Sequence, residues 1–203
     1  MASVYIPKSF VMNEERMKEF IEVHSFGLLM SQHEGQPCGT HLPFLFDSDR
    51  SALYGHVAKA NPQWQDVDGQ DVMTVFSGAH SYISPSWYGI GESVPTWNYV
   101  AVHVYGTCHV MHDPEEFATV LERMVRFYEP GSPIASESGE PYFRRMMQAI
   151  VGFRIDIARM EGAAKLSQNK PAEVRERVIE QLSHSDDSNA QTVARWMKQE
   201  WNQ

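Results

Sequence analysis

Cysteine is scarce in this 203-residue sequence, and basic residues are outnumbered by acidic ones. Two cysteines, Cys38 and Cys108, are too few and too widely separated to form a disulfide framework. Lysine and arginine total 17 against 26 aspartate and glutamate, which gives a formal net charge of −9. Nucleic-acid-binding proteins usually carry a basic face that neutralises phosphates. The overall charge therefore does not favour DNA binding, although it leaves room for a local basic patch.

Long hydrophobic runs are also missing. No stretch approaches the ~18 consecutive apolar residues of a membrane-spanning helix, and the first residues lack the basic start and apolar run of a secretory signal. We therefore expect a cytoplasmic protein with no membrane partner. Hydrophobic residues make up 42% and charged residues 21%, as in ordinary globular proteins. The length predicts one domain, residues 1–203, in which residues 170–203 form a C-terminal helical extension.

The motifs of several enzyme classes are absent. Without Gly-x-Gly-x-x-Gly a Rossmann dinucleotide site is not supported, and without Gly-x-Ser-x-Gly or a paired thiol we do not expect a nucleophilic hydrolase. The densest histidine group is His103, His109 and His112. Gly106 is expected to interrupt the strand that carries the first two, and no cysteine or carboxylate completes a set at metal-ligand spacing. We therefore predict no metal site.

The sequence is instead rich in short strand patterns. Alternating apolar residues predict strands at 52–57, 71–76, 98–104 and 151–157, and runs at 26–30 and 41–46 predict an antiparallel pair. Capping and 3.6-residue periodicity predict helices at 13–24, from Asp113 to Tyr128, at 142–149, at 171–182 and around Val193–Met197. Because no βαβ units repeat, the fold class is predicted as α+β, mainly antiparallel β, with a small barrel and peripheral helices.

Three polar segments and one aromatic loop suggest a ligand site. The segments are 40–44, 55–62 and 165–170, and the Gly/Pro-rich loop 85–97 carries Trp87 and Trp97. A planar cofactor with a phosphate tail needs aromatic and aliphatic walls, amide partners for its ring edge, and cationic or hydroxyl groups for its phosphate. Such segments also occur as ordinary turns and helix caps, so this pattern by itself leaves both interpretations open.

Taken together, five segments resemble the PaiB family of FMN-binding negative transcriptional regulators. They occur in order at residues 5–10, 40–44, 55–64, 75–88 and 94–99, and residues 157–170 fit as well. The resemblance covers about residues 4–183, whereas the last helix, after Asp187, matches least. Ala79 stands where the family pattern has proline, which affects a turn rather than an expected ligand contact.

The resemblance implies an FMN-binding split barrel, the architecture of pyridoxamine-phosphate oxidases, assembled as a homodimer with flavin at the subunit interface. One set of residues would line the isoalloxazine ring, and two of its members, Lys59 and Asn61, would lie toward the ribityl phosphate. This set is His41, Leu42, Pro43, His56, Val57, Lys59 and Asn61. A second set would approach the ring, from the same chain or from the partner subunit: Ser84, Trp87, Trp97 and Asn98. A third set would close the site: Lys165, Ser167 and Gln168.

Two functions follow from the resemblance. The first is negative regulation, direct or indirect, of genes for degradative enzymes and sporulation. Residues 170–203 carry a net charge of −1, which makes a poor DNA surface, so we expect these helices to pack on the barrel through Val178, Leu182 and Trp196. The alternative is an FMN-dependent oxidoreductase of the pyridoxamine-phosphate-oxidase-like group acting on a small molecule. No side chain in the sequence marks an obligatory acid or base, so whether the protein is an enzyme stays open.

Overall fold

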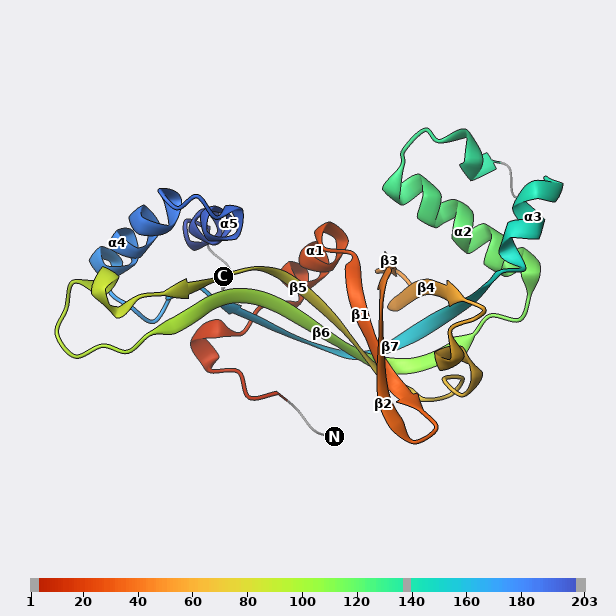
Figure 1. The fold of residues 1–203 in the computed structure, drawn as a ribbon, viewed down its shortest axis with the longest axis horizontal. Helices are drawn as coiled ribbons and strands as arrows, with labels where there is room; N and C mark the ends of the chain where they lie inside the picture. The colour runs from red at the N-terminus through yellow and green to blue at the C-terminus, as the bar shows by residue number, and fades with distance from the viewer. Residues whose placement is uncertain (1–3, 137–139, 200–203) are drawn as a thin grey trace. The chain divides into compact units, whose positions relative to one another are not determined.

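The computed structural model describes residues 4–136 and 140–199, in which one sheet of seven strands is flanked by helices (Figure 1). The strand order is β2-β1-β5-β6-β7-β4-β3, and the β1–β2, β1–β5, β3–β4 and β4–β7 pairs are antiparallel. The strands are β1 (Phe26–His33), β2 (Gln36–Pro43), β3 (Leu45–Asp47), β4 (Ala52–Ala58), β5 (Asp71–Ile83), β6 (Thr96–Val110) and β7 (Ile150–Lys165). The helices are α1 (Glu14–Val23), α2 (Pro114–Tyr128), α3 (Pro141–Met147), α4 (Ala172–Ser183) and α5 (Ser188–Met197). The predicted fold class is confirmed.

The chain divides into two compact units. Unit 1 comprises residues up to 20, residues 77–102 and residues from 161 onward, and unit 2 comprises residues 21–76 and 103–160. The long strands β5, β6 and β7 each contribute residues to both units. The organisation of the chain as a single domain stays a prediction. None of the helices in the described residues is long and apolar enough to cross a membrane.

The core of unit 2 brings β2 and β4 close together. Phe44 packs edge-on against Phe76 and Phe153, at centroid distances of 5.4 and 6.2 Å. Gly55 in β4 has no side chain because a Cβ there would lie 2.8 Å from Cδ1 of Leu42 and from the Phe153 ring. Glycine thus allows Leu42 of β2 to pack directly on the β4 backbone. This contact fixes the two strands that carry the first predicted set of site residues.

In unit 1 the two C-terminal helices pack as expected. Val178 and Leu182 of α4 are fully buried, and the Trp196 ring of α5 lies edge-on to Phe20, at a centroid distance of 6.2 Å. The same tryptophan covers Gly78 of β5, where a Cβ would lie 2.5 Å from the Trp196 ring. The predicted anchoring of this extension on the sheet is therefore confirmed.

Two strands are longer than their patterns predicted. Strand β5 runs without a break through residues 77–80, and β6 runs through Gly106, so the expected interruption at Gly106 is wrong. A Cβ at position 106 would overlap the backbone carbonyl of Asp156 in β7. Glycine here permits a close approach of two strands rather than ending one. His103 and His109 thus share a strand, but among the described residues no three His, Cys, Asp or Glu side chains are grouped as metal ligands.

Candidate functional site

The first predicted set of site residues lies in unit 2, on β2, on β4 and in the loop that follows β4. His41 is exposed on β2, and its ring stacks on that of Phe26 at a centroid distance of 6.2 Å with an interplanar angle of 18°. Pro43 is half-buried. Leu42 and Val57, by contrast, are only 4% and 5% exposed, so their side chains belong to the core. They can offer a ligand their backbone groups alone.

His56 is the polar group of β4 that stands out. Its ring is half-buried, and its Nδ1 is a buried atom without a hydrogen-bond partner. Burial lowers the pKa of His56, because the surroundings disfavour the charged imidazolium. A buried polar atom without a partner is costly in a folded protein. The neutral imidazole therefore has a ring nitrogen, Nδ1, whose hydrogen-bonding capacity is unused.

A hydrogen-bonded network fixes the loop that follows β4. Asn61 donates from Nδ2 to Oγ1 of Thr40 at 2.8 Å and accepts from the backbone N–H of Gln63 at 3.0 Å. Thr40 donates in turn to Gln63, whose amide nitrogen reaches Oγ of Ser31 at 2.9 Å. Asn61 therefore holds the loop against β2 rather than facing a ligand. Sequence reasoning missed Gln63, whose partners lie up to 34 residues away in the chain.

Lys59 lies at the start of this loop, and its backbone is held on both sides. Its N–H donates to the Ala149 carbonyl at 2.8 Å, and its carbonyl accepts from the indole of Trp64 at 2.9 Å. The residue is exposed and lines a cavity of about 470 Å³ in unit 2. Lys59 is thus a residue of the first set whose side chain has room for a ligand beside it.

The second predicted set lies in unit 1 and centres on an exposed aromatic cluster. Trp97 is 52% exposed and neighbours the rings of His80 and Tyr82, at centroid distances of 5.9 and 6.0 Å. A hollow of about 290 Å³ lies beside Trp97 and is lined in part by Gly78 and Tyr99. Large aromatic side chains exposed together are typical of binding surfaces.

Ser84 and Trp87 of the same set lie at the turn after β5. Oγ of Ser84 accepts from the backbone N–H of Ser86 at 3.3 Å and so caps the short 3₁₀ helix Pro85–Tyr88. Trp87 is half-buried within that helix. The loop that looked irregular in sequence is thus partly ordered by this cap. Ser84 has a clear structural role there.

The remaining predicted residues are bonded to one another. Asn98 is fully buried and donates to Oγ of Ser167 at 3.1 Å. Gln168 accepts from the Leu166 N–H at 2.7 Å and donates to the Ala164 carbonyl, while Lys165 donates to Thr96. Ser167 has a φ of +62°, so the turn after β7 needs this local support. These side chains shape the turn beside β6, and their role toward a ligand stays a prediction.

The first set thus lies apart in the chain's division from the other two sets, which share a unit. The first lies wholly in unit 2, and the second and third lie wholly in unit 1. Each unit carries exposed rings: the His41–Phe26 stack in unit 2, and Trp97 with His80 and Tyr82 in unit 1. His56 lies on β4 of unit 2, separately from the stack on β1 and β2.

These residues suit a flavin. The exposed rings offer flat apolar surface for an isoalloxazine, the Nδ1 of His56 offers a hydrogen-bonding group for a polar ring edge, and Lys59 offers positive charge for a phosphate. When bound, such a cofactor supplies the electron-transfer chemistry, and the protein supplies binding and orientation.

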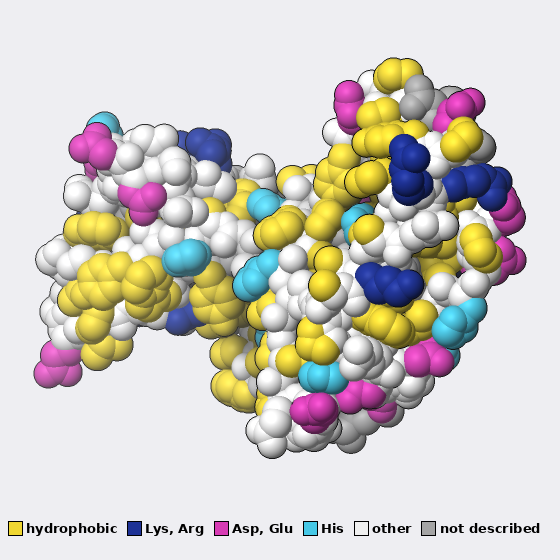
Figure 2. All heavy atoms as spheres, turned by 45° about the vertical axis from the view of Figure 1, so that its right-hand side comes forward, with side chains coloured by type: hydrophobic (Ala, Val, Ile, Leu, Met, Phe, Trp, Pro, Cys, Tyr) yellow, Lys and Arg dark blue, Asp and Glu magenta, His cyan; other side chains and the backbone are white. Residues whose placement is uncertain are grey.

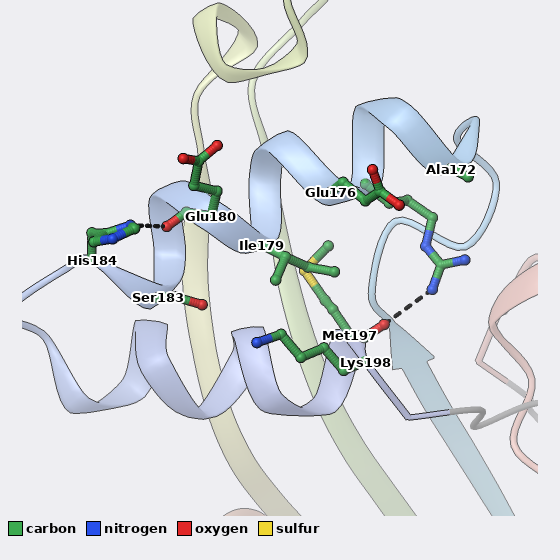
Figure 3. A pocket seen from close by; sticks show the side chains of 9 residues that line it. Ala172, Glu176, Ile179, Glu180, Ser183, His184, Met197 and Lys198 are labelled. Atoms are coloured by element: carbon green, nitrogen blue, oxygen red, sulfur yellow. Dashed lines mark hydrogen bonds between the residues drawn. The ribbon is translucent and has the colours of Figure 1, made fainter.

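A larger hollow between α4 and α5, of about 570 Å³, is less suited to an anionic cofactor (Figure 3). Glu176 and Glu180 line it from α4. Arg175 donates to the Met197 carbonyl at 3.0 Å, and the His184 ring contacts the Glu180 carbonyl at 2.8 Å, so both side chains are engaged at helix ends, while Lys198 also lines the hollow. The carboxylates would repel a phosphate there.

Solved structures define the class of the fold. The flavocytochrome Anf3 from Azotobacter vinelandii superposes with a TM-score of 0.61 at 17% identity, covering 75% of this chain and 67% of its own. The FAD and heme binding protein from Mycobacterium smegmatis has a TM-score of 0.61 at 13% identity, covering 81% and 77%. The fold is a split barrel of the kind found in flavin-binding proteins.

The sequence comparisons then identify the family. Residues 4–159 match the family described as "Putative FMN-binding domain". The "Protease synthase and sporulation protein PAI 2" of Bacillus subtilis is 39% identical over 202 residues, covering 96% of this chain and 97% of that protein. The chain belongs to this PaiB-type family of FMN-binding proteins, and its cofactor is FMN.

Proposed function

We propose that two copies of this chain form a homodimer that holds FMN between them. Strands β2 and β4 of one copy bind the ring through His41 and His56, with Lys59 toward the phosphate, and the aromatic cluster around Trp97 of the other copy covers the flavin. The exposure of that cluster carries the proposal, because Trp97, Tyr82 and Tyr99 are 52%, 45% and 38% exposed on strands whose other faces are buried. Isolated chains seldom leave such a group uncovered.

Visible absorption spectroscopy tests the cofactor. After incubation with FMN and desalting, the wild-type protein is expected to retain about one flavin per chain, since a two-fold dimer repeats its site. Trp97→Ala is expected to lose most of the retained flavin, whereas Tyr142→Ala, which removes an exposed aromatic outside both surfaces, keeps it. Equal retention by wild type and Trp97→Ala would contradict the assigned role of this surface.

We further propose a regulatory role in the cytoplasm, exerted without direct DNA recognition by α4 and α5; the PAI 2 relative is named for protease synthesis and sporulation. Two of the basic side chains of this segment are already engaged: Arg175 with the Met197 carbonyl and Arg177 with the Tyr88 carbonyl, at 2.9 Å from its Nε. Few charges remain to neutralise phosphates.

Retention of promoter DNA at low salt tests this second step. The purified FMN-loaded protein is expected to show no retention that exceeds that of a neutral control protein. Specific retention that weakens steeply as salt rises would establish direct binding and overturn the indirect mechanism.

An FMN-dependent oxidoreductase is the alternative function. The neutral His56 imidazole favours it, because its Nδ1 has no hydrogen-bond partner and can bond to a substrate beside the flavin. Sustained consumption of NADH or NADPH with dioxygen as electron acceptor, measured per retained flavin and lost in His56→Gln but not in His184→Gln, would establish the enzyme. Absence of turnover with either donor would favour the regulatory role.

A further inference from the structure

The buried side chain of Gln63 ties a short helix to two strands of the sheet. It belongs to the 3₁₀ helix η2 (Pro62–Gln65) and is only 3% exposed. Its Nε2 donates to the Leu29 carbonyl at 3.4 Å and to Oγ of Ser31 at 2.9 Å, both on β1, and its Oε1 accepts from Thr40 on β2. Because both ends of the amide are bonded inside the protein, the side chain has one fixed orientation.

The helix η2 is one turn long, so its place on the sheet depends on side-chain contacts. Asn61 caps it by accepting from the Gln63 N–H at 3.0 Å, and Pro62 stands in its first turn. A single 3₁₀ turn makes few hydrogen bonds of its own. The Gln63 amide therefore supplies the link that fixes η2 on β1 and β2, which are neighbours in the sheet.

The next residue, Trp64, connects this turn to Lys59. Its indole Nε1 donates to the Lys59 carbonyl at 2.9 Å, and the Lys59 N–H donates to the Ala149 carbonyl at 2.8 Å. The backbone of Lys59 is thus held between η2 and the residue that precedes β7. A lysine side chain is long and flexible, so its backbone anchor decides which positions its ammonium group can reach. Gln63 and Trp64 together therefore set where the Lys59 side chain begins.

Positive charge is dispersed on this side of the molecule. Figure 2, which brings the side of α2 and α3 forward, shows Lys and Arg side chains in separate groups among hydrophobic and uncharged ones. Arg144 lines the same cavity as Lys59, but its guanidinium is already paired with the Glu115 carboxylate at 2.9 Å. A phosphate that relies on one lysine is sensitive to the placement of that lysine. Lys59 is therefore the point at which FMN can be distinguished from riboflavin, which lacks the phosphate.

We propose that Gln63 is a positioning residue for the phosphate of FMN. It holds η2 on β1 and β2 and, through Trp64, fixes Lys59 so that the protein selects FMN over riboflavin. This inference rests on the proposed role of Lys59 in the flavin site. The Gln63 amide is spent on contacts within the protein. Its loss should therefore weaken binding of the phosphate and leave binding of the ring unchanged.

Fluorescence titration of the full-length, flavin-free protein with FMN and with riboflavin tests the inference. Lys59→Ala is expected to weaken FMN binding at least about tenfold, the effect of losing a charge-assisted hydrogen bond, and to change riboflavin binding by less than about twofold. Gln63→Met, which keeps the length of the side chain and removes the amide, is expected to weaken FMN binding about fivefold with the same small effect on riboflavin. In the Lys59→Ala background it should weaken FMN binding no further.

A second variant and a matched control accompany this pair. Trp64→Phe removes the indole N–H that reaches Lys59 and keeps an aromatic ring, so it should show the same selective loss for FMN. Gln70→Met is the control. The Gln70 amide bonds to the backbone N–H and carbonyl of Gln32 at 3.1 and 3.0 Å, in the segment that follows η2 rather than in the link to Lys59. Its loss should leave the affinities for both flavins unchanged.

Each outcome decides one of the two roles. Equal weakening of FMN and riboflavin by Gln63→Met would show a general loss of structure and overturn the inference. Wild-type FMN affinity in Gln63→Met, beside weakened FMN affinity in Lys59→Ala, would overturn it as well and leave the role of Lys59 intact. If Lys59→Ala binds FMN as the wild type does, the proposed phosphate contact is itself wrong and the inference fails with it. If Gln63→Met does not fold, the result for Trp64→Phe decides in the same way.

Discussion

The imidazole of His56 links the candidate site to the stability of the fold. Burial lowers the pKa of this ring, as it does that of His24, so the folded protein binds fewer protons than the unfolded chain once the pH falls below the ordinary histidine value of about 6.5. The contribution of these neutral rings to the free energy of unfolding is therefore present above that pH and is lost as the pH drops below it.

Replacing His56 with glutamine should flatten this pH dependence. We expect the free energy of unfolding of His56→Gln to decrease less between pH 7 and pH 5 than that of the wild type, as measured by urea denaturation of the flavin-free protein. His24→Gln should reduce the dependence further, and the two effects should add because the residues are separate. An unchanged slope in His56→Gln would show that the ring is more hydrated than its burial indicates.

The two cysteines differ sharply in their environment. Burial, aided by the Asp68 carboxylate, raises the pKa of Cys108 to about 12, whereas Cys38 is half-exposed, with its Sγ 3.4 Å from Oγ of Ser31. Because the thiolate is the reactive form, a neutral thiol reagent should modify Cys38 alone in the native protein. Titration should find one reactive thiol before denaturation and two after it. Cys38→Ser should then show no native reactivity, and rapid labelling of that variant would contradict the burial of Cys108.

At the scale of elements, glycines allow strands and helices to approach one another closely. Gly152 admits the side chain of Phe117, and Gly106 admits a backbone carbonyl of β7. A side chain can move aside, but a paired strand cannot. We expect Gly152→Ala to cost about 1–3 kcal/mol of unfolding free energy and Gly106→Ala to cost more.

A double-mutant cycle separates the two effects. In a Phe117→Leu background, Gly152→Ala should cost less, because the smaller side chain leaves room for the added methyl group. The cost of Gly106→Ala should be the same in both backgrounds, as measured by chemical denaturation. Equal costs of Gly152→Ala with and without Phe117 would show that this ring does not set the spacing between α2 and β7.

Local patterns in the sequence predicted most elements but not their long-range contacts. The cap at Asp113 and the strand alternation at Val100, Val102 and Val104 are local signals, and all three valines are buried as expected. Tyr128 ends the predicted helix as expected and is 46% exposed, but its hydroxyl donates to Oγ of Ser25 at 2.8 Å, a contact that no local pattern indicates. Ser25 is far from Tyr128 in the sequence, and β7, the strand beside Gly106, is far from β6.

The candidate site shows the same limit. The resemblance singled out residues that do lie at strand ends and turns, but Asn98 and Ser167 bond to each other across 69 positions of the chain. Such a pairing consumes the polar groups that would otherwise meet a ligand, and no spacing rule reveals it. Exposure, in contrast, distinguishes Trp97 and His41, which the structure leaves accessible.

For the whole molecule, the proposed flavin site is testable through the assembly of the chain. The ring-binding strands belong to unit 2 and the Trp97 cluster to unit 1, and in the proposed dimer each flavin contacts the strands of one chain and the cluster of its partner. Sedimentation at micromolar concentration should show a dimer, and a monomer that retains FMN would exclude the shared site.

Mixing two defective variants then distinguishes a flavin site formed by two chains from one formed by a single chain. Trp97→Ala damages one surface and His56→Ala the other, so each variant alone should retain little FMN. If each flavin is held by two chains, refolding an equal mixture produces heterodimers with one intact site and one doubly damaged site. Random pairing then restores about a quarter of the wild-type sites. If each site lies within one chain, every site in the mixture carries a defect and no flavin returns, because exchange of partners cannot repair a surface that its own chain lacks.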